Sequence, residues 1–441
     1  MKDKNIVLIV TCFSSFLIPF TSSSINIALP SIGKDFGVDS FFLGWITTSY
    51  ILATAVFLLP FGKIGDIYGR KRVFLYGIII FAIASFLSII PSPPYFFLSF
   101  RIIHAIGSAI IFSNGIAMLS SFFKEDRGKA LGINVSFTYI GLSTGPLIGG
   151  FLTSYFGWRS IFFLMILICI IIILLLGNFK YEFSHNYEKF DYFGSLLFAT
   201  FIISLIYGIS VIGSITGIML AIFSLLIFLV FTLYESRIEK PLIKPSIFKR
   251  NFVFIFSNLT ALIHYSATYS LTFFMSLYLQ NIKNFSASNA GLILISQSVV
   301  QALFSPIAGK ASDKIDAKII ASFGIGLTGI GVFLLSLCIR NNYSIFAIIA
   351  TLSLIGFGFA FFSSPNTNAI MGSVESREYG VASATLATMR VVGQSASMGI
   401  AISLTKSNQF LDAMEKALII SAILCLFGIF TSIVRGRNNY K

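Results

Sequence analysis

The chain has 441 residues, of which 56% are hydrophobic and only 11% carry a charge. A soluble domain carries about 25% charged residues, so this chain lacks the polar surface of a water-soluble globule. The net charge of +14 arises largely from Lys and Arg in short loops between apolar runs, which excludes nucleic acid as a partner and indicates orientation in a membrane.

Apolar runs of about 20 residues recur along the whole chain, and each is long enough to cross ~30 Å of hydrocarbon as a helix. The runs are continuous rather than alternating, which excludes a membrane β-barrel. The sequence therefore predicts an all-α membrane protein. We expect fourteen transmembrane helices, at 6–29, 42–62, 73–91, 95–121, 130–153, 159–179, 192–210, 213–233, 252–279, 288–308, 319–338, 343–364, 379–404 and 413–434.

The distribution of Lys and Arg predicts the orientation of these spans. If the N-terminus is cytoplasmic, the cytoplasmic segments hold 23 Lys and Arg, whereas the outer loops hold six. This bias predicts a multi-pass protein of the cell membrane with both termini in the cytoplasm. The lipid bilayer is then one partner of the chain.

The loop after the second span is a short polar segment between two long apolar runs. It reads Gly62-Lys-Ile-Gly-Asp66-Ile-Tyr-Gly69-Arg70-Lys71. A carboxylate and a guanidinium near a helix end can pair in one conformational state and separate in another. We therefore expect these residues to form a conformational latch. The alternative is a positively charged cytoplasmic loop with no further role.

Arg101 and His104 lie one helical turn apart near the start of the fourth span. A charge inside a span costs ~2.5–3.5 kcal/mol on insertion scales, so such a residue usually faces a wet cavity. The alternative is an arginine that reaches the outer interface from the helix end. His104 can titrate near neutral pH, or it can be a hydrogen-bonded structural residue.

The fifth span contains Gly141, Gly145 and Gly149 at a spacing of four, which places them on one helix face. A neighbouring backbone can approach closely along such a face. Pro146 predicts a bend in the same helix, and Gly150 follows. We expect these five residues to form a helix-bend motif.

The segment Gly309-Lys-Ala-Ser-Asp313 at the end of the tenth span repeats the pattern from Gly62 to Asp66. A parallel repeat of this kind predicts two similar halves. We expect a six-helix bundle at 1–180, a two-helix insert with its flanking loops at 181–251, and a second six-helix bundle at 252–441. Asp313 is then a second latch candidate.

Further polar residues occur in the spans that the repeat places around a central path. Arg390 lies about ten residues from the nearest end of its span, so we expect it to face a cavity or a buried partner. Each amide alone more often makes a helix–helix hydrogen bond than a ligand contact. The set is Asn26, Tyr50, Asn114, His264, Tyr269, Gln297, Gln301, Asn366, Asn368 and Gln394.

Several of these segments resemble motifs of the major facilitator superfamily. The loop from Gly62 to Lys71 resembles the signature loop after the second helix of that family. The segments that start at Arg101 and Gly141 resemble its fourth-helix motif and the fifth-helix motif associated with exporters. Residues 21–30 resemble the first-helix motif of the fourteen-span drug/proton antiporter branch.

The resemblance implies a secondary transporter, not an enzyme, that exports small hydrophobic or amphipathic compounds in exchange for protons. The branch has an Asp where this chain has Thr21, and all seventeen Asp and Glu lie in loops or at helix edges. The candidate proton carriers are then His104, His264 and Asp66. We expect no metal or organic cofactor, because the chain has no phosphate-binding loop and its four Cys show no metal-ligand spacing.

Two alternatives stay open. The same fold could take up or exchange a small organic anion, because Arg101 and Arg390 have no facing carboxylate in the predicted spans. A non-transporting membrane sensor is the other alternative.

Overall fold

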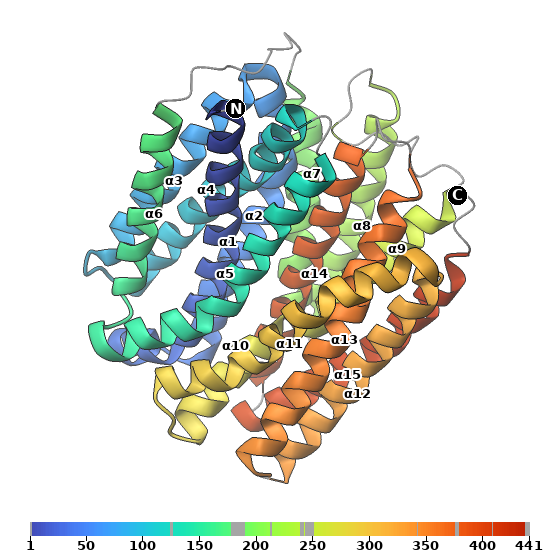
Figure 1. Cartoon of the computed structure of the whole chain (residues 1–441). Coiled ribbons are helices and arrows are strands. Elements are labelled where there is room, and N and C mark those ends of the chain that lie inside the picture. The colour runs from blue at the N-terminus through green and yellow to red at the C-terminus, as the bar shows by residue number, and fades with distance from the viewer. Residues whose placement is uncertain are drawn as a thin grey trace. The chain divides into compact units, whose positions relative to one another are not determined.

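The computed structural model describes residues 2–123, 127–177, 190–211, 214–238, 242, 251–341, 343–374, 379–407 and 409–436. All regular structure in these ranges is helical, and the prediction of an all-α protein is confirmed (Figure 1). The helices are α1 (Lys2–Phe36), α2 (Ser40–Tyr68), α3 (Arg70–Ile89), α4 (Pro94–Phe122), α5 (Arg127–Phe156), α6 (Ser160–Gly177), α7 (Tyr192–Ser210), α8 (Ile215–Glu235), α9 (Phe252–Thr268), α10 (Ser270–Leu277), the π-helical segment η2 (Tyr278–Ile282), α11 (Ala287–Lys314), α12 (Ala317–Arg340), α13 (Ile345–Met371), α14 (Tyr379–Ser407) and α15 (Phe410–Val434).

Eleven helices in the described ranges are long and apolar enough to cross a membrane. Every predicted span overlaps a helix, and the ninth span overlaps α9, α10 and η2 together. The count of fourteen crossings and the central insert stay predictions. Most of the loops predicted to flank the insert, at 178–189 and 239–250, lie outside the described residues.

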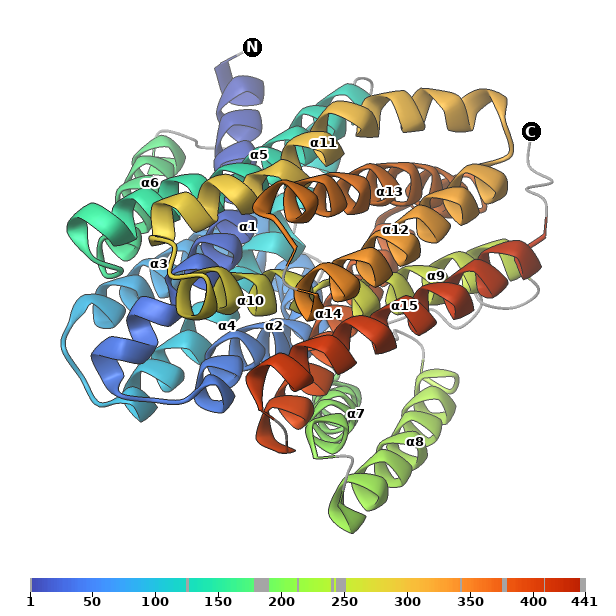
Figure 2. The same ribbon diagram turned by 90° about the horizontal axis from the view of Figure 1, so that it is seen from below.

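The chain divides into two compact units. Unit 1 consists of Met1–Ala199 and Ser276–Leu292, and unit 2 consists of Thr200–Met275 and Ile293–Lys441. The boundary passes through α7, α10 and α11, so each of these helices contributes to both units. In unit 2, α12 packs against α13 and α15, and α15 packs against α9 (Figure 2).

Both units contain a matching pair of close-packed helices. In unit 1, a Cβ atom on Gly107 of α4 would lie 3.0 Å from the carbonyl oxygen of Gly77 in α3. In unit 2, a Cβ atom on Gly358 of α13 would lie 2.8 Å from the carbonyl oxygen of Gly324 in α12. Glycines let two helix backbones approach closely in a membrane protein. The pairs α3–α4 and α12–α13 thus share a close contact between glycines.

A second pair of helices matches in the same way. Gly141 of α5 packs against the carbonyl oxygen of Phe16 in α1. Gly393 of α14 packs against α9, where its Cβ atom would lie 2.5 Å from the carbonyl oxygen of Leu262. The pairs α1–α5 and α9–α14 are therefore alike in this contact, and the internal repeat stays a prediction.

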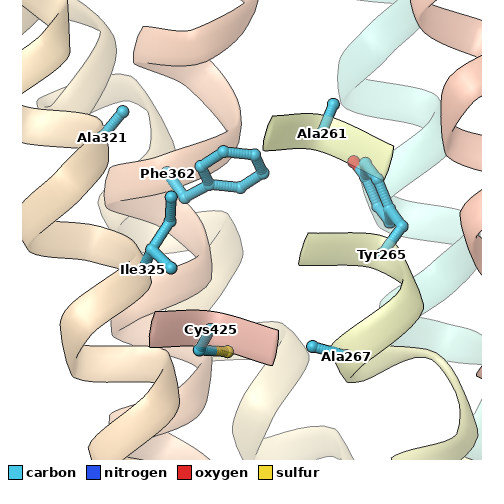
Figure 3. Packing of buried hydrophobic residues seen from close by; sticks show 7 residues of the cluster. All are labelled: Ala261, Tyr265, Ala267, Ala321, Ile325, Phe362 and Cys425. Carbon is cyan, nitrogen blue, oxygen red and sulfur yellow. The ribbon is translucent and has the colours of Figure 1, made fainter. Parts of the chain in front are cut away.

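The core of unit 2 includes a cluster of buried side chains from α9, α12, α13 and α15. Figure 3 shows how these side chains approach one another across the interior. Its members are Ala261, Tyr265, Ala267, Ala321, Ile325, Phe362 and Cys425. The small residues let the four helices approach, and the aromatic rings fill the space between them. Cys425 is buried and free, like the other three cysteines, so it acts as a small apolar residue here.

Candidate functional site

The predicted latch lies at the junction of α2 and α3. Gly69 joins the two helices with φ 99°, a conformation that side chains with a Cβ rarely adopt. Arg70 then donates from Nε to Asp66 Oδ1 at 2.8 Å, and its Nη2 lies 2.7 Å from the same oxygen. Arg70 Nη1 donates to the carbonyl oxygen of Ala117 in α4 at 3.1 Å. One guanidinium therefore joins the α2–α3 junction to the end of α4.

The other latch residues have different surroundings. A Cβ atom on Gly62 would lie 3.6 Å from Ser113 Cβ of α4, which is an ordinary contact distance, and Lys71 is half-buried in the first turn of α3. Gly65 was not singled out from the sequence, although its backbone packs directly on the Asn114 amide. The signal was its place within the loop pattern, three residues after Gly62. The side chain of Asp313, the second-half candidate, lies outside the described residues.

Arg101 and His104 lie together in a buried polar cluster between α2 and α4. Arg101 is 1% exposed and His104 is fully buried. Arg101 Nη1 lies 2.9 Å from His104 Nδ1, and the guanidinium lies 4.3 Å from the centre of the Tyr50 ring. Tyr50 Oη bonds to Ser108 Oγ at 2.7 Å, and Ser108 donates to the carbonyl oxygen of His104. The ring of Tyr50 and Nδ1 of His104 thus both contact the guanidinium.

The hydrogen bonds define the tautomer of His104. A guanidinium can only donate, so His104 Nδ1 accepts from Arg101. The ring proton then lies on Nε2, which is 3.2 Å from Ser85 Oγ. Ser85 in turn donates to the carbonyl oxygen of Phe81 at 2.8 Å. In this conformation His104 is neutral and orients Arg101. The lone pair of its Nδ1 accepts the hydrogen bond from Arg101 and is not available to another donor.

Asn26 lies in the same unit, at the contact between α1 and its neighbours. Its Oδ1 accepts from Thr47 of α2 at 3.2 Å, and its carbonyl oxygen accepts from Ser276 of α10 at 2.6 Å. Gln280 of η2 also donates to α1, to the carbonyl oxygen of Ile27 at 2.9 Å. Sequence reasoning missed Ser276 and Gln280, because nothing local marks a contact that spans about 250 residues.

Three residues of the helix-bend motif pack α5 against α1. Gly141, Gly145 and Gly149 all face α1, as their spacing predicts, and Ser24 donates to the carbonyl oxygen of Gly145 at 3.1 Å. Pro146 lies inside α5 without ending it.

The last residues of the motif turn toward the start of α11. A Cβ atom on Gly150 would lie 2.5 Å from the carbonyl oxygen of Ala287, and the carbonyl oxygen of Pro146 packs on Gly291. The motif therefore holds two neighbours, α1 through its glycine face and α11 through Pro146 and Gly150.

His264 is buried in unit 2 among aromatic rings. Its ring stacks on Phe362 at 4.0 Å and meets Phe359 edge-on at 4.7 Å. Thr328 uses its hydroxyl hydrogen on the carbonyl oxygen of Gly324, so it can only accept from His264 Nε2, at 3.5 Å. Nδ1 of His264 is therefore an acceptor, and it has no hydrogen-bond partner within the described part of the chain.

The remaining candidates also belong to unit 2. The Arg390 guanidinium lies 5.1 Å from the centre of the Tyr265 ring. Gln301 is buried, Gln297 and Gln394 are half-buried, and the carbonyl oxygen of Gln297 packs on Gly356 of α13. The structure thus brings Arg101 together with His104, and it places Arg390 and His264 next to the same ring, that of Tyr265. No group of three metal-binding side chains occurs in the described ranges.

The chain is similar in sequence to known membrane transporters. A family model described as Major Facilitator Superfamily matches residues 11–189 and 257–438. The riboflavin transporter RibZ of Clostridioides difficile (strain 630) is 32% identical over 459 residues, which cover 100% of this chain and 99% of RibZ. The multidrug resistance protein Stp of Mycobacterium tuberculosis (strain CDC 1551 / Oshkosh) is 27% identical, covering 91% of this chain and 75% of Stp.

Solved structures share the fold at much lower identity. The crystal structure of a peptide transporter POT in complex with sulfate matches with a TM-score of 0.72 at 12% identity. The match covers 98% of this chain and 96% of the transporter.

Proposed function

Because this chain belongs to the Major Facilitator Superfamily, we propose that it is a secondary active transporter that carries a small organic compound by alternating access. Members of this family are multi-pass membrane transporters and not enzymes. We further propose fourteen transmembrane helices, in two six-helix bundles with a two-helix insert, and both termini in the cytoplasm of a cell-membrane protein. The bias of Lys and Arg toward one set of loops supports this orientation.

The observation that carries the substrate proposal is the buried guanidinium of Arg101 over the ring of Tyr50. A planar donor on an aromatic face suits a flat, carbonyl-rich ring or an organic anion. Riboflavin has such a ring, with two carbonyl oxygens at one edge. The full-length similarity to a riboflavin transporter supports riboflavin as the first candidate.

Export of amphipathic compounds is the second candidate. The segment from Gly141 to Gly150 resembles the motif of exporters, and a relative is named as a multidrug resistance protein. In this reading the half-buried and aromatic residues of unit 2, such as Arg390 on Tyr265, contact the compound.

We propose protons as the coupling ion for either substrate. Thr21 cannot carry a proton, and its hydroxyl already donates to the carbonyl oxygen of Leu17 at 2.7 Å. The lone pair of His104 is occupied by Arg101, whereas Nδ1 of His264 is open. His264 is therefore the better candidate of the two for accepting a proton when the site opens to water.

Transport by proteoliposomes tests the function. The purified chain is reconstituted, and entry of radiolabelled riboflavin, a cationic dye and an aromatic carboxylate is measured with an imposed pH gradient of either sign. Saturable riboflavin entry that responds to the gradient supports the first candidate, and dye movement supports the second. Absence of movement of all three compounds would overturn the proposal. Arg340→Ala is the control for Arg101→Ala. Arg340 is exposed, and its ion pair with Glu415 is long, at 3.4 Å.

A further inference from the structure

Arg435 lies directly after α15, yet only 1% of its surface is exposed. Its Nη1 donates to Asn366 Oδ1 of α13 at 3.0 Å and to Ser257 Oγ of α9 at 3.3 Å. One buried guanidinium therefore joins the ends of three helices of unit 2.

The partners of Arg435 also bond to each other. Asn366 Nδ2 donates to the carbonyl oxygen of Ser257 at 3.1 Å, so these three residues form a closed triangle of hydrogen bonds. Close by in the sequence, Asn251 Nδ2 donates to the carbonyl oxygen of Ser373 at 2.6 Å. The first turn of α9 is thus tied to the end of α13 at two places.

The charge of Arg435 is retained at neutral pH. Burial lowers the pKa of Arg435 to about 10, and the carboxylate of Asp316 acts in the opposite direction. Asp316 caps the start of α12, where its Oδ1 accepts from the backbone N–H of Lys318 at 2.9 Å. A buried charge is tolerated when hydrogen bonds and an opposite charge surround it.

Unit 1 also joins helix ends through an arginine. There Arg70, from the junction of α2 and α3, bonds to the end of α4. The junction of α11 and α12 has no such arginine, because Ala317 stands four residues after Asp313, where Arg70 stands four residues after Asp66. In the predicted repeat α13 is the counterpart of α4, so Arg435 supplies to α13 a guanidinium that the loop of unit 2 lacks.

We propose that Arg435 is the counterpart of Arg70 in unit 2, a positioning residue that keeps the ends of α9, α13 and α15 together during transport. The inference rests on the proposed transport function, and it assigns Arg435 no contact with the substrate. The ends of α9, α13 and α15 then move together. The arginine that joins them follows α15 and does not lie at the junction of α11 and α12.

Two variants and a matched control test this role. Arg435→Gln removes the charge, Arg435→Lys keeps it without the planar fork, and Arg340→Gln changes an arginine whose side chain is 68% exposed. Hydrogen exchange of the full chain in nanodiscs is measured at residues 252–258 and 366–374. We expect faster exchange there in Arg435→Gln, an intermediate effect in Arg435→Lys and no change in Arg340→Gln.

Riboflavin transport, expressed per amount of folded protein, separates a role in transport from a loss of folded protein. We expect the maximal rate of Arg435→Gln to fall about tenfold with little change in KM, because the substrate contacts stay intact. Asn366→Ala should add little to Arg435→Gln, since the two residues share one network.

Two results would overturn the inference: unchanged hydrogen exchange in Arg435→Gln, or faster exchange with a normal transport rate. If wild-type protein moves none of the test compounds, the proposed substrate is contradicted, and hydrogen exchange alone still decides whether Arg435 holds the three helices.

Discussion

The two glycines Gly324 and Gly326 of α12 lie two residues apart and face different surroundings. A Cβ atom on Gly324 would lie 2.5 Å from the backbone nitrogen of Phe362 in α13 and 2.7 Å from the carbonyl oxygen of Gly358. A Cβ atom on Gly326 would have only Ile429 Cδ1 nearby, at 3.7 Å. Gly324→Ala should therefore separate α12 from α13, whereas Gly326→Ala should be accommodated.

The size of the effect follows from these distances. Ordinary contact begins at 3.4 Å, so α12 and α13 would have to part by about 0.9 Å, the difference between 3.4 and 2.5 Å. Overpacking of this kind costs ~1–3 kcal/mol. The gain in helix propensity on replacing Gly by Ala, ~0.5–1 kcal/mol, is common to both variants and cancels in the comparison. We expect Gly324→Ala to be less stable than Gly326→Ala by ~1–3 kcal/mol.

Unfolding of both variants by SDS titration in mixed micelles measures this difference. Gly358→Ala should behave like Gly324→Ala, because its Cβ atom would lie 2.6 Å from the backbone nitrogen of Thr328. Equal stability of Gly324→Ala and Gly326→Ala would refute the reasoning, since it would show that α12 and α13 do not approach as closely as described.

Four further predictions concern the candidate sites. Asp66→Asn should lower the transport rate strongly and leave membrane insertion normal, because Arg70 loses its charged partner; wild-type flux would contradict the latch. Arg101→Ala should abolish riboflavin flux and Arg101→Lys should keep part of it, whereas full flux in Arg101→Ala would reduce Arg101 to a helix anchor. His104→Gln should keep most transport activity, because the Gln amide oxygen can still accept from Arg101, whereas His104→Phe has no acceptor and should lose activity. Equal transport rates of the two variants would argue against the bond between Arg101 and His104. His264→Gln should remove the response of transport to an imposed pH gradient, and a normal response would exclude His264 as the proton carrier.

The helices and their close faces could be predicted from the sequence. A continuous apolar run of about 20 residues must pair its backbone groups internally in lipid, and a helix does this. Every predicted span accordingly overlaps a helix. The spacing of Gly141, Gly145 and Gly149 also predicted a shared face, and all three pack on α1. These predictions succeed because helical periodicity depends only on residues a few positions apart.

Contacts between distant segments could not be predicted in the same way. Tyr50 and Arg101 meet across two helices, and no pattern near either residue indicates the partner. Arg435 follows the last apolar run, and a basic residue at such a place normally faces water or lipid head groups. Its burial depends on Ser257 and Asn366, which are 178 and 69 positions away. Such contacts follow from the packing of whole helices and not from local composition.

The division of the chain falls inside helices. The boundary between the units passes through α7, between Ala199 and Thr200, through α10, between Met275 and Ser276, and through α11, between Leu292 and Ile293. The π-helical segment η2 begins three residues after Met275. Short π-helical segments frequently occur at functional sites, so a substitution in the α10–η2 segment, where Ser276 and Gln280 bond to α1, should alter transport.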